Sequence, residues 1–182
     1  MDTQSLALGL PLIGWAAHSA LLTHRLATAR RDPLTGLRTR AGWTVRAERF
    51  IRRHRDSAVL LLDLDEFKSL NDTHGHAAGD AALAATAARL TGWCEHYGFA
   101  GRLGGDEFVA VHRRSDLDRL TALLHVPVMH DSQPLPVSVS VGSCRLADLP
   151  VRSLPEALAV ADAAMYAAKG TNGRRGSRHT TR

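Results

Sequence analysis

Cysteine is scarce in this chain. Cys94 and Cys144 are the only two among 182 residues, they lie far apart, and neither has a metal-ligand partner at the usual spacing. A disulfide scaffold is therefore not expected, and a reduced cytosolic domain is the simplest interpretation. Internal repeats and low-complexity linkers are absent as well, and the length suits one domain of ordinary size with a short appendage.

A basic face interleaved with aromatic residues, which would favour nucleic-acid binding, is also missing. The formal charge is +5, but the basic residues cluster at two places, residues 24–31 and 174–179. Such clusters are most often solvated ends, and less often sites for phosphates, anionic lipid or nucleic acid. Nucleic acid is thus a disfavoured partner. Hydrophobic residues at 45% and charged residues at 23% are typical of a globular domain with a buried core.

No apolar run of comfortable membrane-spanning length is present. The 17 residues from Leu6 to Leu22 are at the short edge of what crosses a bilayer, and glycines, a proline and a histidine interrupt them. Positive residues follow this stretch rather than precede it, which argues against a secretory signal and, if the stretch inserts, places the rest of the chain at the cytoplasmic face of the membrane. Two interpretations stay open: a membrane anchor, or an apolar helix that pairs with its copy in a dimer.

From Arg31 onward, helix-like and strand-like patterns alternate. Helices are predicted over residues 39–55, 65–70, 77–93, 115–124 and 154–169, strands over 58–64 and 137–144, and a hairpin over 99–112. In the last helix we expect Ala157, Val160, Ala161, Ala164 and Met165 to point inward. This order favours an α+β architecture of ferredoxin-like type, with a central sheet covered by helices. The expected organisation is an N-terminal apolar helix over residues 1–30, a globular domain over 31–175 and a basic, disordered tail over 176–182.

Two acidic clusters stand at the ends of predicted strands. Asp63 and Asp65 end the first apolar strand, and Asp106-Glu107 follows the glycine pair of the hairpin. If the two strands are neighbours, Asp63 and Asp106 meet across the sheet. Paired carboxylates on rigid strand ends suit Mg²⁺ and phosphoryl transfer. Taken alone, these residues are better explained as a surface acidic turn with Asp65 as a helix N-cap.

The acidic clusters belong to a longer series of motifs. In chain order these are Asp32-Pro33-Leu34-Thr35-Gly36-Leu37, the stretch from Asp63 through Phe67-Lys68 and Asn71 to Gly79-Asp80, Arg102 before Gly104-Gly105-Asp106-Glu107-Phe108, Ser138-Val139-Ser140-Val141-Gly142, and Ala161-Asp162 through Met165-Tyr166 to Lys169. This series resembles the GGDEF family of diguanylate cyclases. The resemblance implies a palm-type sheet, like that of nucleotidyl cyclases and polymerases, with GTP held over the hairpin.

The resemblance also implies roles for the acidic residues. Asp63, the backbone carbonyl of Leu64 and Asp106 would bind Mg²⁺ or Mn²⁺. Asp106 and Glu107 would form the acidic pair at the reacting centre, where one helps to deprotonate the ribose 3′-hydroxyl. Lys68 would offset charge on the phosphates in the transition state.

Further family positions would contact the substrate. Asn71 and Asp80 match the pair that reads guanine, and His76 falls at another substrate position. Lys169 and Arg174 match phosphate ligands. Phe67 and Phe108 are expected in the core rather than against the substrate.

The chain departs from the family pattern at three places. Thr39 stands where the family usually has Asn, a change that a helix start tolerates. One extra residue separates Lys169 from Arg174. The product-binding motif Arg-x-x-Asp reads Glu95-His96-Tyr97-Gly98, so product inhibition through that site should be absent.

The implied activity condenses two GTP molecules into cyclic di-GMP and two pyrophosphates, across a homodimer of half-sites. The alternative is a silent module that binds GTP or cyclic di-GMP as an effector. Because few residues precede the domain, we expect control through the N-terminal segment, expression level or a partner rather than through an attached sensor.

Overall fold

The computed structural model describes residues 30–114 and 116–176, with side chains to residue 170. The apolar stretch Leu6–Leu22 and residues 177–182 of the predicted tail lie outside the described residues. Within the described part, no helix combines the length and hydropathy needed to cross a membrane.

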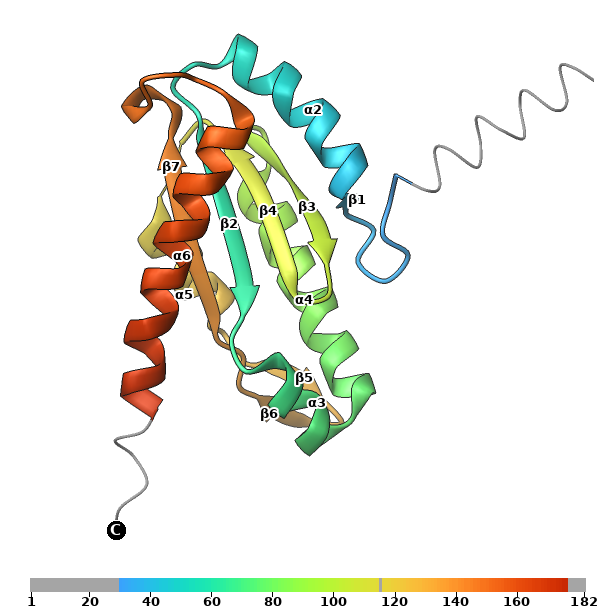
Figure 1. Cartoon of the computed structure of the whole chain (residues 1–182). Coiled ribbons are helices and arrows are strands. Elements are labelled where there is room, and N and C mark those ends of the chain that lie inside the picture. Colours follow the sequence, from blue (N-terminus) through green and yellow to red (C-terminus); the bar gives the residue numbers. More distant parts are fainter. Residues whose placement is uncertain (1–29, 115, 177–182) are drawn as a thin grey trace, which may run out of the picture.

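The described chain forms one mixed sheet, a small second sheet and the helices that pack around them (Figure 1). In chain order the elements are β1 (Arg38–Thr39), α2 (Arg40–Arg53), β2 (Ala58–Leu64), α3 (Phe67–His74), α4 (His76–Cys94), β3 (Gly98–Gly104), β4 (Glu107–His112), α5 (Leu117–Leu124), β5 (Val128–His130), β6 (Gln133–Leu135), β7 (Val139–Arg145), the 3₁₀ turn η1 (Leu146–Asp148) and α6 (Leu154–Gly176).

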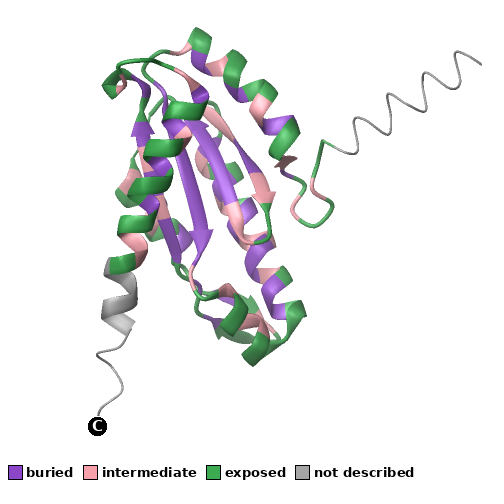
Figure 2. Cartoon of the chain, in the orientation of Figure 1, coloured by how far each residue is buried: buried purple, intermediate pink, exposed green. Residues whose placement is uncertain are grey.

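The main sheet has the strand order β1-β3-β4-β2-β7. β1 pairs with β3 in parallel, and the other neighbours are antiparallel. All seven residues of β2 are buried, because β2 lies between β4 and β7 and both of its faces are covered (Figure 2). This explains why its sequence is a nearly continuous apolar run, with no polar alternation.

Two hydrophobic clusters lie on opposite faces of the sheet. On one face Leu60 and Leu62 pack with residues of α4 and α5, and on the other Val59 and Leu61 pack with residues of α2 and α6. Trp43 of α2 is fully buried in the second cluster. Successive side chains of β2 therefore alternate between two cores, which fixes the register of the strand.

The α+β class, the first long strand and the hairpin are confirmed, since β2 spans the predicted residues and β3 pairs with β4. The expected inner face of the last helix was partly wrong. Ala157, Ala161 and Met165 are buried, but Val160 is 42% exposed and Ala164 is exposed too. The reason is that α6 contacts the sheet along one narrow stripe: a Cβ on Gly142 of β7 would overlap the α6 backbone. The β5–β6 hairpin was not predicted.

Candidate functional site

Three segments that are distant in sequence meet at one end of the sheet. They are the end of β2, the β3–β4 turn and the C-terminal part of α6 (Figure 1). Asp63 of β2 lies opposite Glu107 of β4 in the antiparallel register, and the Leu64 amide donates to the Asp106 carbonyl at 3.3 Å. The predicted adjacency of the two acidic strand ends is therefore confirmed. We call Asp63 and Asp106 the acidic centre.

The β3–β4 turn takes its shape from two glycines. Gly104 has φ 152° and Gly105 has φ 49°, a region that residues with a Cβ rarely adopt. Arg102 closes the turn: its Nε and Nη2 donate to the Gly105 carbonyl at 3.0 and 2.7 Å. The acidic residues that follow the glycines are thus presented on a fixed backbone.

A second brace ties this turn to the loop before β1. Nη1 of Arg102 donates to Asp32 Oδ1 at 2.9 Å, and the same oxygen accepts from the amide and hydroxyl of Thr35 at 2.8 and 2.6 Å. Burial alone would raise the pKa of Asp32, but the hydrogen bonds from Thr35 and Arg102 outweigh it and lower the pKa. Asp32 is therefore held ionised, and through Arg102 it fixes the β3–β4 turn.

The Asp63 carboxyl is buried, and both its burial and a neighbouring negative charge disfavour its ionised form. Burial is the main cause that raises its pKa, and the neighbouring charge of Asp106 adds to the rise. Lys169 of α6 acts the other way, because its Nζ lies 2.7 Å from Asp63 Oδ1. The lysine predicted to bind phosphate therefore rests on the predicted metal ligand.

Asp65 has a structural role that the sequence did not reveal. Its two carboxylate oxygens accept from the hydroxyls of Ser138 and Ser140, each at 2.6 Å, and its amide donates to the Ser138 carbonyl at 2.9 Å. The idea that Asp65 caps a helix was wrong, because Glu66, with φ 53°, is the N-cap of α3. The alternation of serine with valine before Gly142 was the available signal. This alternation predicts a strand and matches a family motif, but it does not by itself identify the two serines as donors to Asp65.

The residues predicted to read guanine lie on two consecutive helices, α3 and α4. Asn71 of α3 faces Gly79 of α4 so closely that a Cβ on Gly79 would overlap its side-chain oxygen. Asp80 follows Gly79 and is exposed, and His76 at the start of α4 is exposed as well. The two helices therefore bring Asn71 beside the Gly79-Asp80 pair.

The remaining predicted residues lie on α3, β4 and α6. Lys68 is exposed on α3. Glu107 points to Arg40 of α2, with 3.5 Å between the carboxylate and the guanidinium. Phe108 is fully buried, and Phe67 is partly buried against the same core. Arg174 lies in α6 beyond the side chains that the structure describes.

A family model described as "Diguanylate cyclase, GGDEF domain" matches residues 29–175. The chain belongs to the GGDEF family. It is 65% identical over 181 residues, 98% of each chain, to an uncharacterized 19.3 kDa protein from the repSA 5′ region of Streptomyces ambofaciens.

Proteins with more specific names are similar to the GGDEF part. Diguanylate cyclase DgcP of Pseudomonas aeruginosa is 40% identical over 139 residues, which are 70% of this chain and 21% of DgcP. The chain thus spans about a fifth of that relative. A crystal structure of a sensory box/GGDEF family protein from Caulobacter crescentus matches with a TM-score of 0.71 and 38% identity, over 79% of this chain and 99% of that one.

The acidic centre of this GGDEF domain has the donor chemistry for a hard cation. Within the described residues, no group of three or more His, Cys, Asp or Glu side chains is placed to hold a metal ion. Mg²⁺ does not require one, since it commonly binds one or two carboxylates and takes its other ligands from water and substrate phosphates. The ammonium of Lys169 beside Asp63 marks a position that attracts positive charge. The residues present fit Mg²⁺ or Mn²⁺.

Proposed function

We propose that this GGDEF protein is an active diguanylate cyclase, which condenses two GTP molecules into cyclic di-GMP. The supporting observation is the meeting of Asp63 and Asp106 beside the braced glycine turn. A catalytically silent module has no need to hold two carboxylates together, since their mutual repulsion costs free energy. Here the repulsion is retained, and it raises the pKa of Asp63.

In the proposed mechanism, Asp63, the Leu64 carbonyl and Asp106 would hold the divalent cation. When bound, the cation neutralises charge that develops on the phosphate oxygens during transfer. Asp106 and Glu107 then lie beside the reacting centre, where one of them accepts the proton of the ribose 3′-hydroxyl. The 3′-oxygen forms a bond to the α-phosphorus, the bond from this phosphorus to the bridging oxygen breaks, and pyrophosphate leaves with the electron pair.

Lys169 lies 2.7 Å from Asp63 and neutralises its charge. Together with Lys68, it would offset the negative charge that develops on the phosphates in the transition state. Arg174 is proposed as a further phosphate ligand.

Guanine selection is assigned to Asn71 and Asp80. An amide and a carboxylate match the O6 side and the N1–H and N2–H₂ side of guanine, and a wrong base would leave these groups unpaired. Exposed His76 stands nearby at the start of α4. The half-site therefore binds one GTP.

Two half-sites must face each other for a full reaction, so the active species is proposed to be a homodimer. Alignment of two bound nucleotides turns a bimolecular step into an effectively unimolecular one. The stretch Leu6–Leu22, outside the described residues, is the proposed device that holds two copies together, either directly or on a membrane.

The deciding experiment incubates the full chain with GTP and Mg²⁺ and separates the nucleotides by chromatography. The proposal expects cyclic di-GMP and pyrophosphate to form in the presence of Mg²⁺ and not with EDTA. Saturable GTP binding with no turnover at any protein concentration would instead support the silent effector module.

A further inference from the structure

An open groove lies at the end of the sheet opposite to the acidic centre. Its volume is about 870 Å³, and the C-terminal half of α2, η1 and the loop from η1 to α6 enclose it. Figure 1 shows these segments at the end of the sheet where β2 begins, whereas α3 and β5 lie at the other end. Arg52, Arg55 and Arg152 line the groove, together with one carboxylate, Glu48. We call this site the basic groove.

The arginines of the basic groove have no counter-charge within the described domain. Among the residues whose side chains the structure describes, no carboxylate forms an ion pair with Arg52, Arg55 or Arg152. All three arginines are exposed. Exposed cations without an internal partner attract external negative charge. Because these side chains stand open to solvent, they suit an extended anionic surface better than one enclosed small ligand.

An exposed apolar side chain stands beside these arginines. Val151 precedes Arg152 and is 68% exposed, although Leu149, two residues earlier, packs against the hydrophobic core. Transfer of such a side chain out of water is favourable. A surface that combines basic residues with an exposed apolar one matches the boundary of a membrane, where acidic headgroups lie next to acyl chains.

The chain outside the described residues gives a second reason to expect a membrane at this surface. The Thr39 amide donates to the Arg30 carbonyl at 3.0 Å, so the described domain begins beside the start of α2. Residues 23–29 separate Arg30 from the apolar stretch Leu6–Leu22 and span at most about 25 Å when extended. The 14 residues of α2 extend over roughly 21 Å. The stretch Leu6–Leu22 and the basic groove are therefore close enough to contact the same membrane.

We propose that the basic groove docks on an anionic lipid membrane, with Arg52, Arg55 and Arg152 on the acidic headgroups and Val151 in the headgroup layer. This orientation leaves the acidic centre accessible. The Leu146 amide donates to the Ser57 carbonyl at 3.0 Å, which places the groove at the start of β2, and the seven residues of β2 put Asp63 roughly 20 Å farther from the lipid. The proposal does not depend on cyclase activity.

A fluorophore that reports the polarity of its surroundings tests this orientation in the full chain. Val151→Cys provides the attachment point, because Cys94 and Cys144 are both buried. Met129→Cys is the matched control, since Met129 is 65% exposed but lies on β5 at the other end of the sheet (Figure 1). We expect the emission from position 151 to shift to the blue with vesicles of phosphatidylcholine and phosphatidylglycerol, but not with phosphatidylcholine alone. Added salt should weaken this shift, and position 129 should show none.

Three further substitutions in the Val151→Cys protein identify the groups responsible. Arg55→Gln should raise the anionic lipid concentration for half-maximal shift about fivefold, because each arginine near an anionic surface contributes roughly this factor. Arg119→Gln, which removes an exposed arginine of α5 outside the groove, should leave that concentration unchanged. Glu48→Gln should lower it severalfold, a gain that misfolding does not produce.

Four outcomes would overturn the proposal. They are the absence of any shift at position 151, equal shifts with neutral and anionic vesicles, an equal shift at position 129, and equal lipid requirements in all three substituted proteins. A shift at position 151 that grows with protein concentration in the absence of vesicles would instead assign the groove to a second copy of the chain, and would overturn the proposal as well.

Discussion

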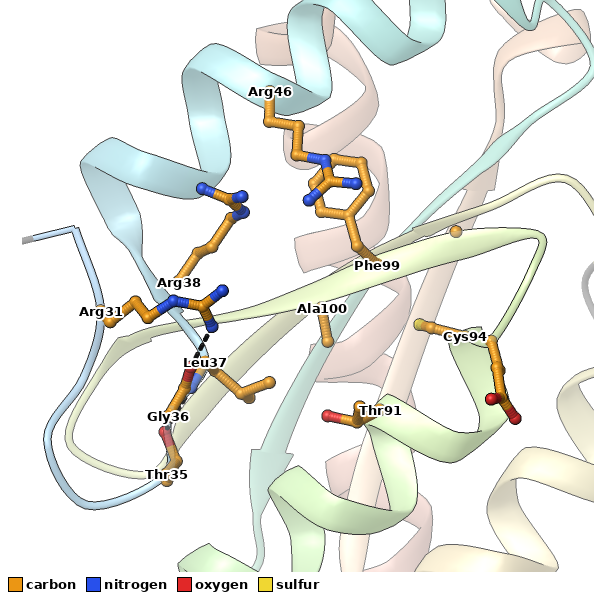
Figure 3. A pocket seen from close by; sticks show the side chains of 12 residues that line it. Arg31, Thr35, Gly36, Leu37, Arg38, Arg46, Thr91, Cys94, Phe99 and Ala100 are labelled. Carbon is orange, nitrogen blue, oxygen red and sulfur yellow. Dashed lines mark hydrogen bonds between the residues drawn. The ribbon is translucent and has the colours of Figure 1, made fainter. Parts of the chain in front are cut away.

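The acidic centre and the arginine pocket, a hollow beside β3 lined by Arg31, Arg38 and Arg46 (Figure 3), both bring like charges together. Among the described residues, only the acidic centre has an ion pair of opposite charge. At the acidic centre, Lys169 reaches Asp63 from α6. In the arginine pocket, no described residue forms an ion pair with the three guanidinium groups. Among the described residues, the first arrangement therefore folds with its own counter-charge and the second does not.

Arg102 forms a bridge between the regions that contain these two clusters. Arg102 holds the Gly105 carbonyl on one side and Asp32 on the other, and the loop that begins at Asp32 ends beside Arg38. We therefore expect substitutions in the acidic centre to change the reaction rate and substitutions of Arg102 to change the position of the turn. In both clusters, like charges held close together should lower the stability of the fold.

The largest effect is expected when the acidic centre loses a member. Asp106→Ala should lower cyclase turnover by roughly 10²–10³-fold or more, because it removes a cation ligand and a carboxylate at the reacting centre. The fold should persist, since Asp106 lies in a partly exposed turn. Initial rates of cyclic di-GMP formation, with circular dichroism as the control, measure this. Near-normal turnover would remove the acidic centre from the mechanism.

Breaking the bridge should have the next largest effect. Arg102→Gln takes one hydrogen bond from Asp32 and the fork from Gly105, so the turn loses its position, and a small misplacement of catalytic groups costs up to about 100-fold in rate. The free energy of unfolding should fall by about 1–3 kcal/mol, because Asp32 loses its counter-charge. Urea unfolding and kcat report the two effects. The matched control, exposed Arg113→Gln, should change neither; a rate loss as large in that control would show that net charge, rather than the bridge, sets the rate.

A smaller effect is expected from the serine contacts of Asp65. In Asp65→Asn, the amide nitrogen cannot accept a hydroxyl hydrogen bond, so one of the two serines loses its acceptor. The neighbouring Leu64 carbonyl would then be held less firmly. We expect the Mg²⁺ concentration for half-maximal activity to rise by roughly threefold to tenfold, since the loss of one hydrogen bond is worth about 0.5–1.5 kcal/mol. Exposed Asp72→Asn should leave it unchanged. An unaltered Mg²⁺ requirement in Asp65→Asn would show that the serine contacts of Asp65 contribute to stability and not to cation binding.

The smallest effect concerns stability and pH. The pKa of Asp63 is raised above 3.8 in the folded protein, so the native state holds this proton more tightly than the unfolded chain does. Its contribution to stability is therefore lost as the pH rises from 3.8 through the raised pKa. Asp63→Asn should remove this fall and leave thermal stability at neutral pH equal or slightly higher. Melting temperatures from pH 4 to pH 8 test it, and a clear loss of stability at neutral pH would mean that the Lys169 pair stabilises the fold.

The sequence predicted elements where one physical signal dominated. β2 was predicted to the residue because both of its faces are buried, and its apolar run ends at the carboxylate of Asp63. The β5–β6 hairpin was missed because its strands have three residues each, one of these residues is a proline, and half of them are exposed. The two-residue β1 gives no periodicity at all.

The adjacency of the two acidic strand ends was predictable from the sequence, but the side-chain contacts around them were not. Motif spacing brought Asp63 and Asp106 together, and the strand register confirms their adjacency. The partner of Lys169, the bridge through Arg102 and the serine contacts of Asp65 depend on side-chain directions at the sheet edge. They join residues more than 65 positions apart, which no local pattern encodes.

The position of β2 at the centre of the sheet has a consequence for amide hydrogen exchange. Its backbone pairs with β4 on one side and β7 on the other, so the amides of Ala58–Leu64 should exchange only when the domain opens globally. α3 has no buried residue and should exchange through local opening. The helix that carries Asn71 can therefore unfold and refold repeatedly during the lifetime of one folded molecule, while the strand that carries Asp63 stays hydrogen-bonded to its neighbours.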